Sequence, residues 1–249
     1  MTELGSYLVL LVAGFIAGTL NVVAGGGSFL TLPILIFLGL PATVANGTNR
    51  VAVLTQNVGA VWSFHQHGVM DWRTSLLSAA LPAMTGAWLG AKLALQIGDE
   101  AFKDTLAFLM VAVTLWTLWD PLKGKLGSSP GGRPRWMIAL AFFVVGVYSG
   151  FVQAGVGFLI LAATTLSGLD LVKGNAVKVL VILATMVVSL GIFASDGKVD
   201  WLLGFVLGAG NLVGGLVGVR LTVLKGHGWI KKVVTATVIL FALRLWFFE

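Results

Sequence analysis

Long apolar segments recur along the whole of this 249-residue chain, and they constrain its fold more than any other feature. They cover residues 5–39, 51–64, 72–97, 102–119, 136–169, 177–193, 201–224 and 229–248. Several reach the roughly 20 residues that an α-helix needs to cross a bilayer. The chain is 57% hydrophobic and only 10% charged, far outside the range of soluble domains. Because the pattern lacks the short alternating segments of a β-barrel, the sequence predicts an all-α integral membrane protein in the lipid bilayer.

The chain repeats itself at an interval of about 130 residues. The segments HGVMDW (67–72) and DGKVDW (196–201) match at Gly, Asp and Trp. The same interval pairs polar residues and glycines: Asn46 with Asn175, Asn49 with Lys178, Gly25 with Gly155, and Gly27 with Gly157. We therefore predict a first membrane repeat (1–120), a cytoplasmic linker (121–135) with many Pro, Gly and Ser residues, and a second membrane repeat (136–249).

Three consecutive glycines interrupt the first apolar segment, in NVVAGGGSFLTLP (21–33). Each Gly costs roughly 1 kcal/mol against Ala inside a helix, so the run predicts a break. A short helix would then begin near Ser28 with free backbone N–H groups, and such a helix end attracts anions. QAGVGFL (153–159) is a weaker copy in the second half. Each repeat is thus predicted to contain a glycine-broken helical hairpin followed by three transmembrane helices.

The positions of Lys and Arg predict how the two repeats face. If each broken segment returns to the side from which it came, the repeats have opposite orientations. With the linker in the cytoplasm, 11 of the 16 basic residues fall inside and 5 outside, as the positive-inside rule requires. A straight first segment would instead place the two most basic regions on opposite faces. We therefore predict inverted-topology repeats, typical of secondary transporters, with both termini outside.

The polar residues within the apolar segments indicate the chemistry of a site. All ten acidic residues lie in loops or at segment ends, so no mid-membrane carboxylate is available for a cation. Asn46, Asn49 and Arg50 share one helical face, and Asn175 and Lys178 repeat part of this spacing. Such cations and amides would together bind an oxyanion such as sulfonate, sulfite or carboxylate.

We predict a substrate-binding site formed by the helix breaks and the polar residues near them. Its candidates are Asn21, Gly25, Gly26, Gly27, Ser28, Asn46, Thr48, Asn49, Arg50, Gln56, Asn57, Gln153, Gly155, Gly157, Asn175 and Lys178. Structural roles stay open for three pairs of these. Arg50 and Lys178 could reach lipid headgroups, Asn46 and Asn175 could be N-caps, and Asn21 and Gln153 could merely satisfy the broken backbone.

The remaining features argue against an enzyme and against a bound metal. The three histidines lie in loops without a ligand constellation, and the chain has no Cys and no phosphate-binding GxxxxGK[ST] motif. We predict no catalytic residues, no metal and no cofactor. The net charge of +6 is explained by orientation in the membrane rather than by nucleic acid. The expected partners are a small anion and lipid, while protons, another coupling ion and a second copy of the chain are left open.

Paired glycines elsewhere in the apolar segments predict close packing of helices rather than a site. These small-xxx-small pairs are Gly14 and Gly18, Gly86 and Gly90, Gly146 and Gly150, and Gly214 and Gly218.

The segment GFIAGTLNVVAGGGSFLTLPILIFLGLPATVANGTNR (14–50), followed by GVMDW and GAWLGAKL, resembles the TauE/SafE sulfite exporter family. The resemblance covers nearly the whole chain, but the second copy lacks the Pro that follows the glycines. It implies a secondary transporter of the bacterial inner membrane for sulfite or short organosulfonates. It also implies that Gly25, Gly26, Gly27, Asn46, Thr48 and Asn49 belong to the family's recurrent pieces. A passive anion channel and a carrier of small carboxylates are the alternatives.

Overall fold

The computed structural model describes residues 3–70, 72–118 and 134–247, and its regular elements are helices throughout these ranges. The first half contains α1 (Glu3–Val23), α2 (Ser28–Phe37), α3 (Ala42–Gln66), α4 (Trp72–Ser75), the π-helical turn η1 (Leu76–Ala80), α5 (Leu81–Gln96) and α6 (Asp99–Leu118). The second half contains α7 (Arg135–Phe151), α8 (Val156–Leu166), α9 (Leu171–Ser195) and α10 (Trp201–Phe247). The predicted linker lies outside the described residues apart from its last two.

Within the described residues, three helical segments are long and apolar enough to cross a membrane: α1, α9 and residues Trp201–Lys225 of α10. Shorter apolar helices, among them α2 and α8, lie between them. The prediction of an all-helical membrane protein is thereby confirmed. α3 is as long as α9, but the polar residues of its first half lower its hydropathy.

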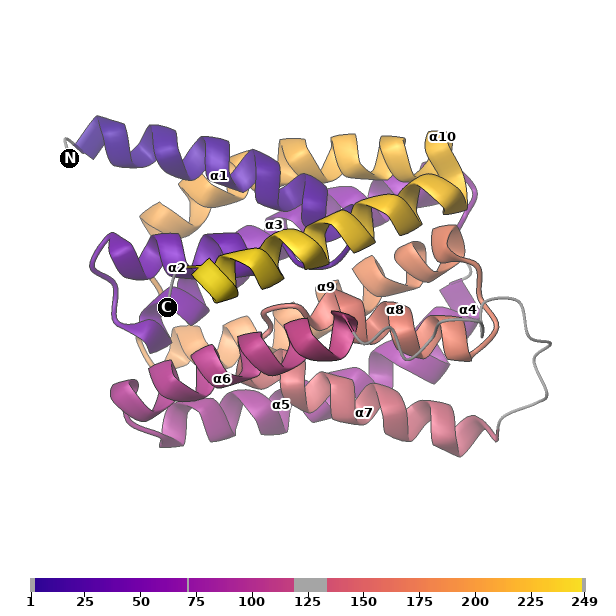
Figure 1. The fold of residues 1–249 in the computed structure, drawn as a ribbon. Coiled ribbons are helices and arrows are strands. Elements are labelled where there is room, and N and C mark those ends of the chain that lie inside the picture. The colour runs from indigo at the N-terminus through magenta and orange to yellow at the C-terminus, as the bar shows by residue number, and fades with distance from the viewer. Residues whose placement is uncertain (1–2, 71, 119–133, 248–249) are drawn as a thin grey trace.

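Two helices begin several residues before the apolar runs from which they were predicted. α3 starts at Ala42, ahead of the apolar run that begins at Val51, and α9 starts at Leu171, ahead of the run that begins at Val177. Asn46 and Arg50 are therefore inside α3, and Asn175 is inside α9. The predicted segments 201–224 and 229–248 fall in the single element α10, whose yellow C-terminal part runs back across the molecule in Figure 1.

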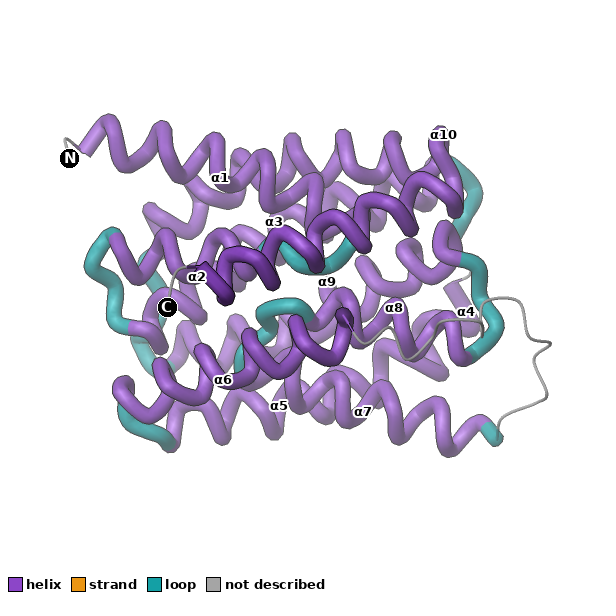
Figure 2. The backbone as a smooth tube through the Cα atoms, in the orientation of Figure 1, coloured by secondary structure: helices purple, strands orange, loops and turns teal. Residues whose placement is uncertain are grey.

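Both predicted helix breaks are present and lie in the interior. α1 ends at Val23 and α2 begins at Ser28, while α7 ends at Phe151 and α8 begins at Val156. Figure 2 shows these two connections as loops in the middle of the molecule, whereas the other described loops lie at its two ends. In Figure 1, α1 begins and α2 ends at the left, while α7 begins and α8 ends at the right. The two broken hairpins therefore enter the molecule from opposite ends.

The two halves interlock through close helix pairs. α1 of the first half packs along α10 of the second, and α7 of the second half packs along α5 of the first. Glycines line both contacts, because a Cβ on Gly14 or Gly18 would overlap α10 and one on Gly146 or Gly150 would overlap α5. A Cβ on Gly86 or Gly90 would likewise overlap α7 and one on Gly214 would overlap α1, while one on Gly218 would lie 3.0 Å from Thr19 of α1. The paired glycines are thus packing residues, as predicted. α3 and α9 lie against each other between these pairs.

Candidate functional site

The two helix breaks touch each other at the centre of the protein. A Cβ added to Gly25 would overlap the backbone of Gly157, and one added to Gly157 would overlap the backbone of Gly25. Gly25 also has a φ of +99°, a conformation that side chains rarely adopt. The first break therefore requires Gly25 for its conformation, and the crossing of the two breaks requires both glycines for their size.

The C-terminal end of α7 accepts hydrogen bonds from side chains of α3, a helix of the other half. Arg50 is fully buried and donates from Nη2 to the carbonyl of Gly150 at 2.6 Å and from Nη1 to the carbonyl of Ser149 at 3.1 Å. Asn46 donates from Nδ2 to the carbonyl of Phe151 at 2.9 Å. The last carbonyls of a helix have no intrahelical donor, so these contacts satisfy the C-terminal end of α7.

The end of α1 is held in the corresponding way by α9. Lys178 is also fully buried, and its Nζ donates to the carbonyl of Val22 at 2.6 Å and to Oδ1 of Asn175. Nδ2 of Asn175 donates to the carbonyl of Val23 at 3.4 Å. Each half thus supplies one cation and one asparagine to the broken helix of the other half. A cation at this position is favourable because the C-terminal end of a helix carries partial negative charge.

These contacts exclude two structural roles that sequence reasoning left open, headgroup binding for Arg50 and Lys178 and N-capping for Asn46 and Asn175. Neither Arg50 nor Lys178 reaches a lipid interface, since both side chains are wholly buried. Neither Asn46 nor Asn175 is an N-cap, because the N-cap of α3 is Pro41 and that of α9 is Asp170. The repeat shift pairs Lys178 with Asn49, yet Lys178 has the structural role of Arg50. Positions three and four residues after the asparagine lie on nearly the same helical face.

Arg50 has two further contacts that sequence reasoning missed. Its Nη1 donates to Oγ of Ser189 in α9 at 2.7 Å, and its guanidinium lies over the ring of Phe193, 4.5 Å from the centroid. Nε of Arg50 is buried without a partner. Ser189, a hydroxyl within an apolar segment, was the available sequence signal for the first of these contacts.

A polar network joins the starts of α2 and α3 to the second break. Oγ of Ser28 accepts from Nδ2 of Asn49 and from Nε2 of Gln153, each at 3.3 Å. Oδ1 of Asn49 accepts from the hydroxyl of Thr31 at 2.7 Å, a residue that was not among the candidates. Ser28, the first residue of α2, therefore links both halves of the protein.

Gln153 is the one residue with a side chain that adopts a positive φ among the described residues, at 68°. Left-handed backbone costs a residue with a Cβ about 1–2 kcal/mol and is usual for Gly or Asn. The side chain is buried, and its Oε1 has no partner. A strained, non-glycine residue with an unused buried acceptor is typical of a functional site.

Asn21, the predicted counterpart of Gln153, satisfies the broken backbone. Its Oδ1 accepts from the N–H of Gly27 at 3.2 Å, and its Nδ2 donates to Oε1 of Gln56 at 3.3 Å. Tyr148, which was not a candidate, supports the second break by donating to the carbonyl of Ala154 at 2.5 Å. Both breaks are therefore held by side chains from the helix that precedes them.

The other candidates differ in their distance from the breaks. Gly26, Gly27 and Gly155 belong to the breaks themselves, and Gly155 has a φ of +72°. Asn57 donates only to the carbonyl of Val53 in its own helix, and its Oδ1 is buried without a partner. Thr48 instead accepts from the N–H of Asp200 at 2.8 Å and so ties α3 to the loop before α10. Thirteen of the sixteen candidates form or directly contact the two breaks or their capping network; Gln56 joins this network through Asn21, and Asn57 and Thr48 do not.

The buried charge around the two helix breaks is positive. Arg50 and Lys178 are the buried cations of the described residues, and none of the described acidic residues is buried. The starts of α2 and α8 add partial positive charge, since neither N-cap residue, Gly27 or Gly155, has a side chain to accept a hydrogen bond. No group of His, Cys, Asp and Glu that could hold a metal occurs among the described residues.

Fold and site together define a multi-pass membrane protein with two broken helices whose ends meet in the interior, a construction typical of secondary transporters. The chain belongs to the family described as sulfite exporter TauE/SafE, which matches residues 10–245. This is a family of membrane transporters and not of enzymes.

Bacterial relatives agree with this assignment. The chain is 31% identical over 248 residues to the probable membrane transporter protein ORF9 of Sinorhizobium sp, covering 98% of this chain and 95% of the relative. It is 31% identical to the probable membrane transporter protein YfcA of Escherichia coli K12, covering 91% and 84%. A probable membrane transporter protein of Haemophilus influenzae is 29% identical, covering 91% and 89%. No solved structure gives a significant match to the chain.

Proposed function

We propose that this protein is a secondary transporter of small sulfur-containing oxyanions, sulfite or short organosulfonates, that works by alternating access. The observation that carries this proposal is the positive centre at the crossing of the two breaks. Two buried cations lie there, and no carboxylate among the described residues accompanies them inside the protein. A buried charge that lacks a counter-ion is costly, and an anion that binds beside it lowers that cost.

The N-terminal ends of α2 and α8 define where the anion would bind. The C-terminal ends of α1 and α7 are covered by Lys178 and Arg50, so their partial negative charge is neutralised. The N-terminal ends of α2 and α8 lie at the same crossing without capping side chains from their N-cap residues. Several N–H groups at these ends already have partners, among them those of Gly27, Phe29 and Val156. An oxyanion at this point would therefore be held by the partial positive charge of the two helix ends and by the second N–H of the Gln153 amide, whose first N–H is donated to Ser28.

We further propose that residues 1–120 and 136–249 are inverted-topology repeats of a bacterial inner-membrane protein, with both termini outside. The opposite directions of the two broken hairpins support this arrangement. The packing of α1 on α10 and of α5 on α7, each pair joining a helix of one half to a helix of the other, also supports it. In alternating access, one half would rock against the other about the crossing. The caps on α1 and α7 would then keep each broken helix attached to α9 or α3 of the opposite half.

Counterflow in proteoliposomes tests the function. Vesicles loaded with unlabelled sulfite should take up labelled sulfite faster than empty vesicles, with saturation at high concentration. Arg50→Gln should abolish the uptake, whereas Lys225→Gln, on the exposed surface of α10, should leave it unchanged. Currents that rise in proportion to voltage and exceed carrier rates would show a passive anion channel instead. Counterflow by acetate but by no sulfur anion would favour the carboxylate alternative.

A further inference from the structure

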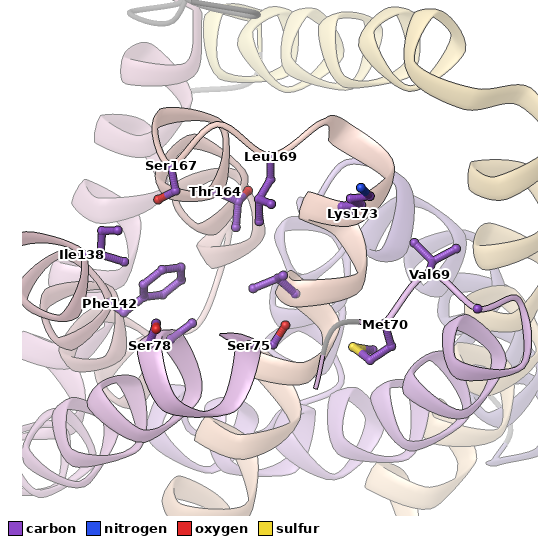
Figure 3. Close-up of a pocket in the computed structure, with 13 residues that line it drawn as sticks. Val69, Met70, Ser75, Ser78, Ile138, Phe142, Thr164, Ser167, Leu169 and Lys173 are labelled. Atoms are coloured by element: carbon purple, nitrogen blue, oxygen red, sulfur yellow. The ribbon is translucent and has the colours of Figure 1, made fainter. Parts of the chain in front are cut away.

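A cavity of about 500 Å³ opens between the two halves at the end of the molecule where α7 begins. Figure 3 shows its lining. One side comes from α4 and η1 with Ser75 and Ser78, and another from α8 and α9 with Thr164 and Lys173. Ile138 and Phe142 of α7 and Val69 and Met70 of the loop after α3 complete it. None of these residues belongs to the site at the helix breaks.

Ser75 gives this cavity an unused hydrogen-bonding group. Its side chain is 2% exposed, and its Oγ has no partner. The hydroxyl points toward the cavity in Figure 3. Buried hydroxyls are almost always hydrogen-bonded, so a buried free hydroxyl that faces a cavity indicates a ligand that would complete it.

The π-helical turn next to Ser75 shapes the same wall. η1 covers Leu76–Ala80, and Ser78 and Ala79 from this turn line the cavity. Pro82 follows at the start of α5 and has no N–H for the carbonyl of Ser78. π-helical turns are rare and occur frequently at functional sites, because they widen a helix and redirect its side chains.

The cavity combines one cation with a largely apolar wall. The ammonium group of Lys173 lies at its rim in Figure 3. The neighbouring carboxylate of Asp170 accepts from the backbone N–H groups of Val172 and Lys173 at 2.9 and 3.0 Å, so it is committed to the start of α9. Phe142, Ile138, Leu169, Val69 and Met70 add carbon surface to the lining of the cavity. A small inorganic anion would leave this surface in contact with water.

We propose that this cavity is a binding site for a small organic anion with an apolar carbon chain, such as a short alkylsulfonate. Ser75 donates a hydrogen bond to the anionic group, the flexible side chain of Lys173 turns inward from the α9 side of the cavity to pair with the same group, and the wall around Phe142 buries the chain. The identification of this ligand as a transported substrate rests on the function proposed above. Within that function, the cavity selects organic sulfonates over inorganic sulfur anions.

An apolar cluster connects the cavity to the helix breaks. Ala79, Phe142 and Val177 line the cavity and pack in the same cluster as Val156, the first residue of α8. Val53, three residues before Gln56 in α3, belongs to this cluster too. A ligand in the cavity is therefore separated from the crossing by packed side chains, and these side chains would have to move for it to pass.

Binding of butane-1-sulfonate to purified protein in lipid nanodiscs, measured by equilibrium dialysis, tests the site. Lys173→Gln should weaken binding about tenfold or more, and Ser75→Ala several-fold. Ala79→Phe should fill the cavity and abolish binding. Lys225→Gln is the matched control and should bind as the unchanged protein does. The uncharged butan-1-ol should bind Lys173→Gln and the unchanged protein alike, and the unfolding temperature of each variant shows whether it is folded.

The outcomes separate the cavity from the central site. Equal binding by folded Lys173→Gln, Ser75→Ala and the unchanged protein would overturn the cavity proposal, even if sulfite counterflow were observed. Sulfate binding as tightly as butane-1-sulfonate would overturn the preference for an organic anion. If the cavity variants lose binding while no anion shows counterflow, the cavity stands as a binding site and the proposed transport function fails.

Discussion

Gly25 and Gly157 lie backbone against backbone where the two broken helices cross, and neither position has room for a Cβ. One glycine comes from each half of the chain, so this contact fixes how the halves meet. The polar groups of the centre are arranged around it. Arg50 and Asn46 act on one side and Lys178 and Asn175 on the other, each pair holding a helix that belongs to the opposite half.

We expect Gly157→Ala to destabilise the protein by about 1–3 kcal/mol or more, because its methyl group would overlap Gly25 and neither backbone can move far in a packed interior. Gly191→Ala is the matched control. Gly191 lies in α9, where a Cβ would meet nothing within 4 Å, and Ala favours a helix by roughly 1 kcal/mol over Gly. Thermal unfolding in detergent should therefore move in opposite directions for the two variants. Similar unfolding temperatures would show that the breaks are not in tight contact.

The sequence predicted the helix breaks because glycine runs within apolar segments have few other uses. It also predicted the face that Asn46, Asn49 and Arg50 share, since helical periodicity alone determines which residues are neighbours on a surface. It did not predict where α3 begins. Hydropathy places the start near Val51, but the polar residues before it are buried by other helices, which only the tertiary fold provides.

The hydrogen-bond partners of Arg50 and Lys178 also could not be predicted from the sequence. Arg50 was expected to face a ligand, and the contacts that occupy both of its terminal nitrogens come from α7 and α9, distant in the chain. A partial signal existed, because every helix break leaves several carbonyls without a donor. Because the chain has two helix breaks and one cation at a similar position in each half, the sequence could have suggested that each cation caps a broken helix. Which break each cation holds depends on the exchange of helices between the halves.

We expect Arg50→Lys to lower both stability and transport, although it keeps the charge. A single ammonium group cannot replace the guanidinium, which reaches the carbonyls of Ser149 and Gly150 and the hydroxyl of Ser189 together. Each buried acceptor left without a donor costs about 1–3 kcal/mol. Ser189→Ala removes only one of these contacts and should have a smaller effect. Unfolding temperature and sulfite counterflow, measured on the same preparations, check the order. Equal effects of the two variants would contradict the capping role.

We expect Gln153→Gly to separate stability from function. The change relieves a positive φ that costs about 1–2 kcal/mol, but it also removes the hydrogen bond to Ser28, worth about 1 kcal/mol. The free energy of unfolding should therefore change little, while anion transport is lost with the amide. Gln153→Ala keeps the strain and loses the amide, so it should be both less stable and inactive. Full transport by Gln153→Gly would remove Gln153 from the site.

Acid should weaken the protein at the start of α3, where Asp99, the first residue of α6, accepts hydrogen bonds from the first residues of α3. Its Oδ1 accepts from the N–H and hydroxyl of Thr43 at 2.9 and 2.7 Å, and its Oδ2 accepts from the N–H of Ala42 at 3.1 Å. Desolvation alone raises the pKa of Asp99, but these hydrogen bonds and the charge of Lys198 outweigh it and hold the pKa below its usual range. A carboxyl whose pKa falls on folding stabilises the native state at pH values above its unfolded pKa of about 3.9, and this stabilisation is lost as the pH falls through the lower folded value.

Asp99→Asn removes this pH-dependent contribution and tests it directly. At neutral pH we expect Asp99→Asn to unfold at a lower temperature than the unchanged protein. Both carboxylate oxygens of Asp99 accept hydrogen bonds, whereas an amide has one acceptor oxygen and its NH2 group would face a backbone N–H of Ala42 or Thr43. The difference between the two should shrink as the pH falls from about 4, the pKa of the unfolded carboxyl, through the lower pKa of Asp99 in the folded protein. Glu100→Gln is the control, since Glu100 is exposed and lies in the same first turn of α6. A difference that stays constant from neutral to acid pH would show that the charge of Asp99 contributes nothing, and that the cap acts through its hydrogen bonds alone.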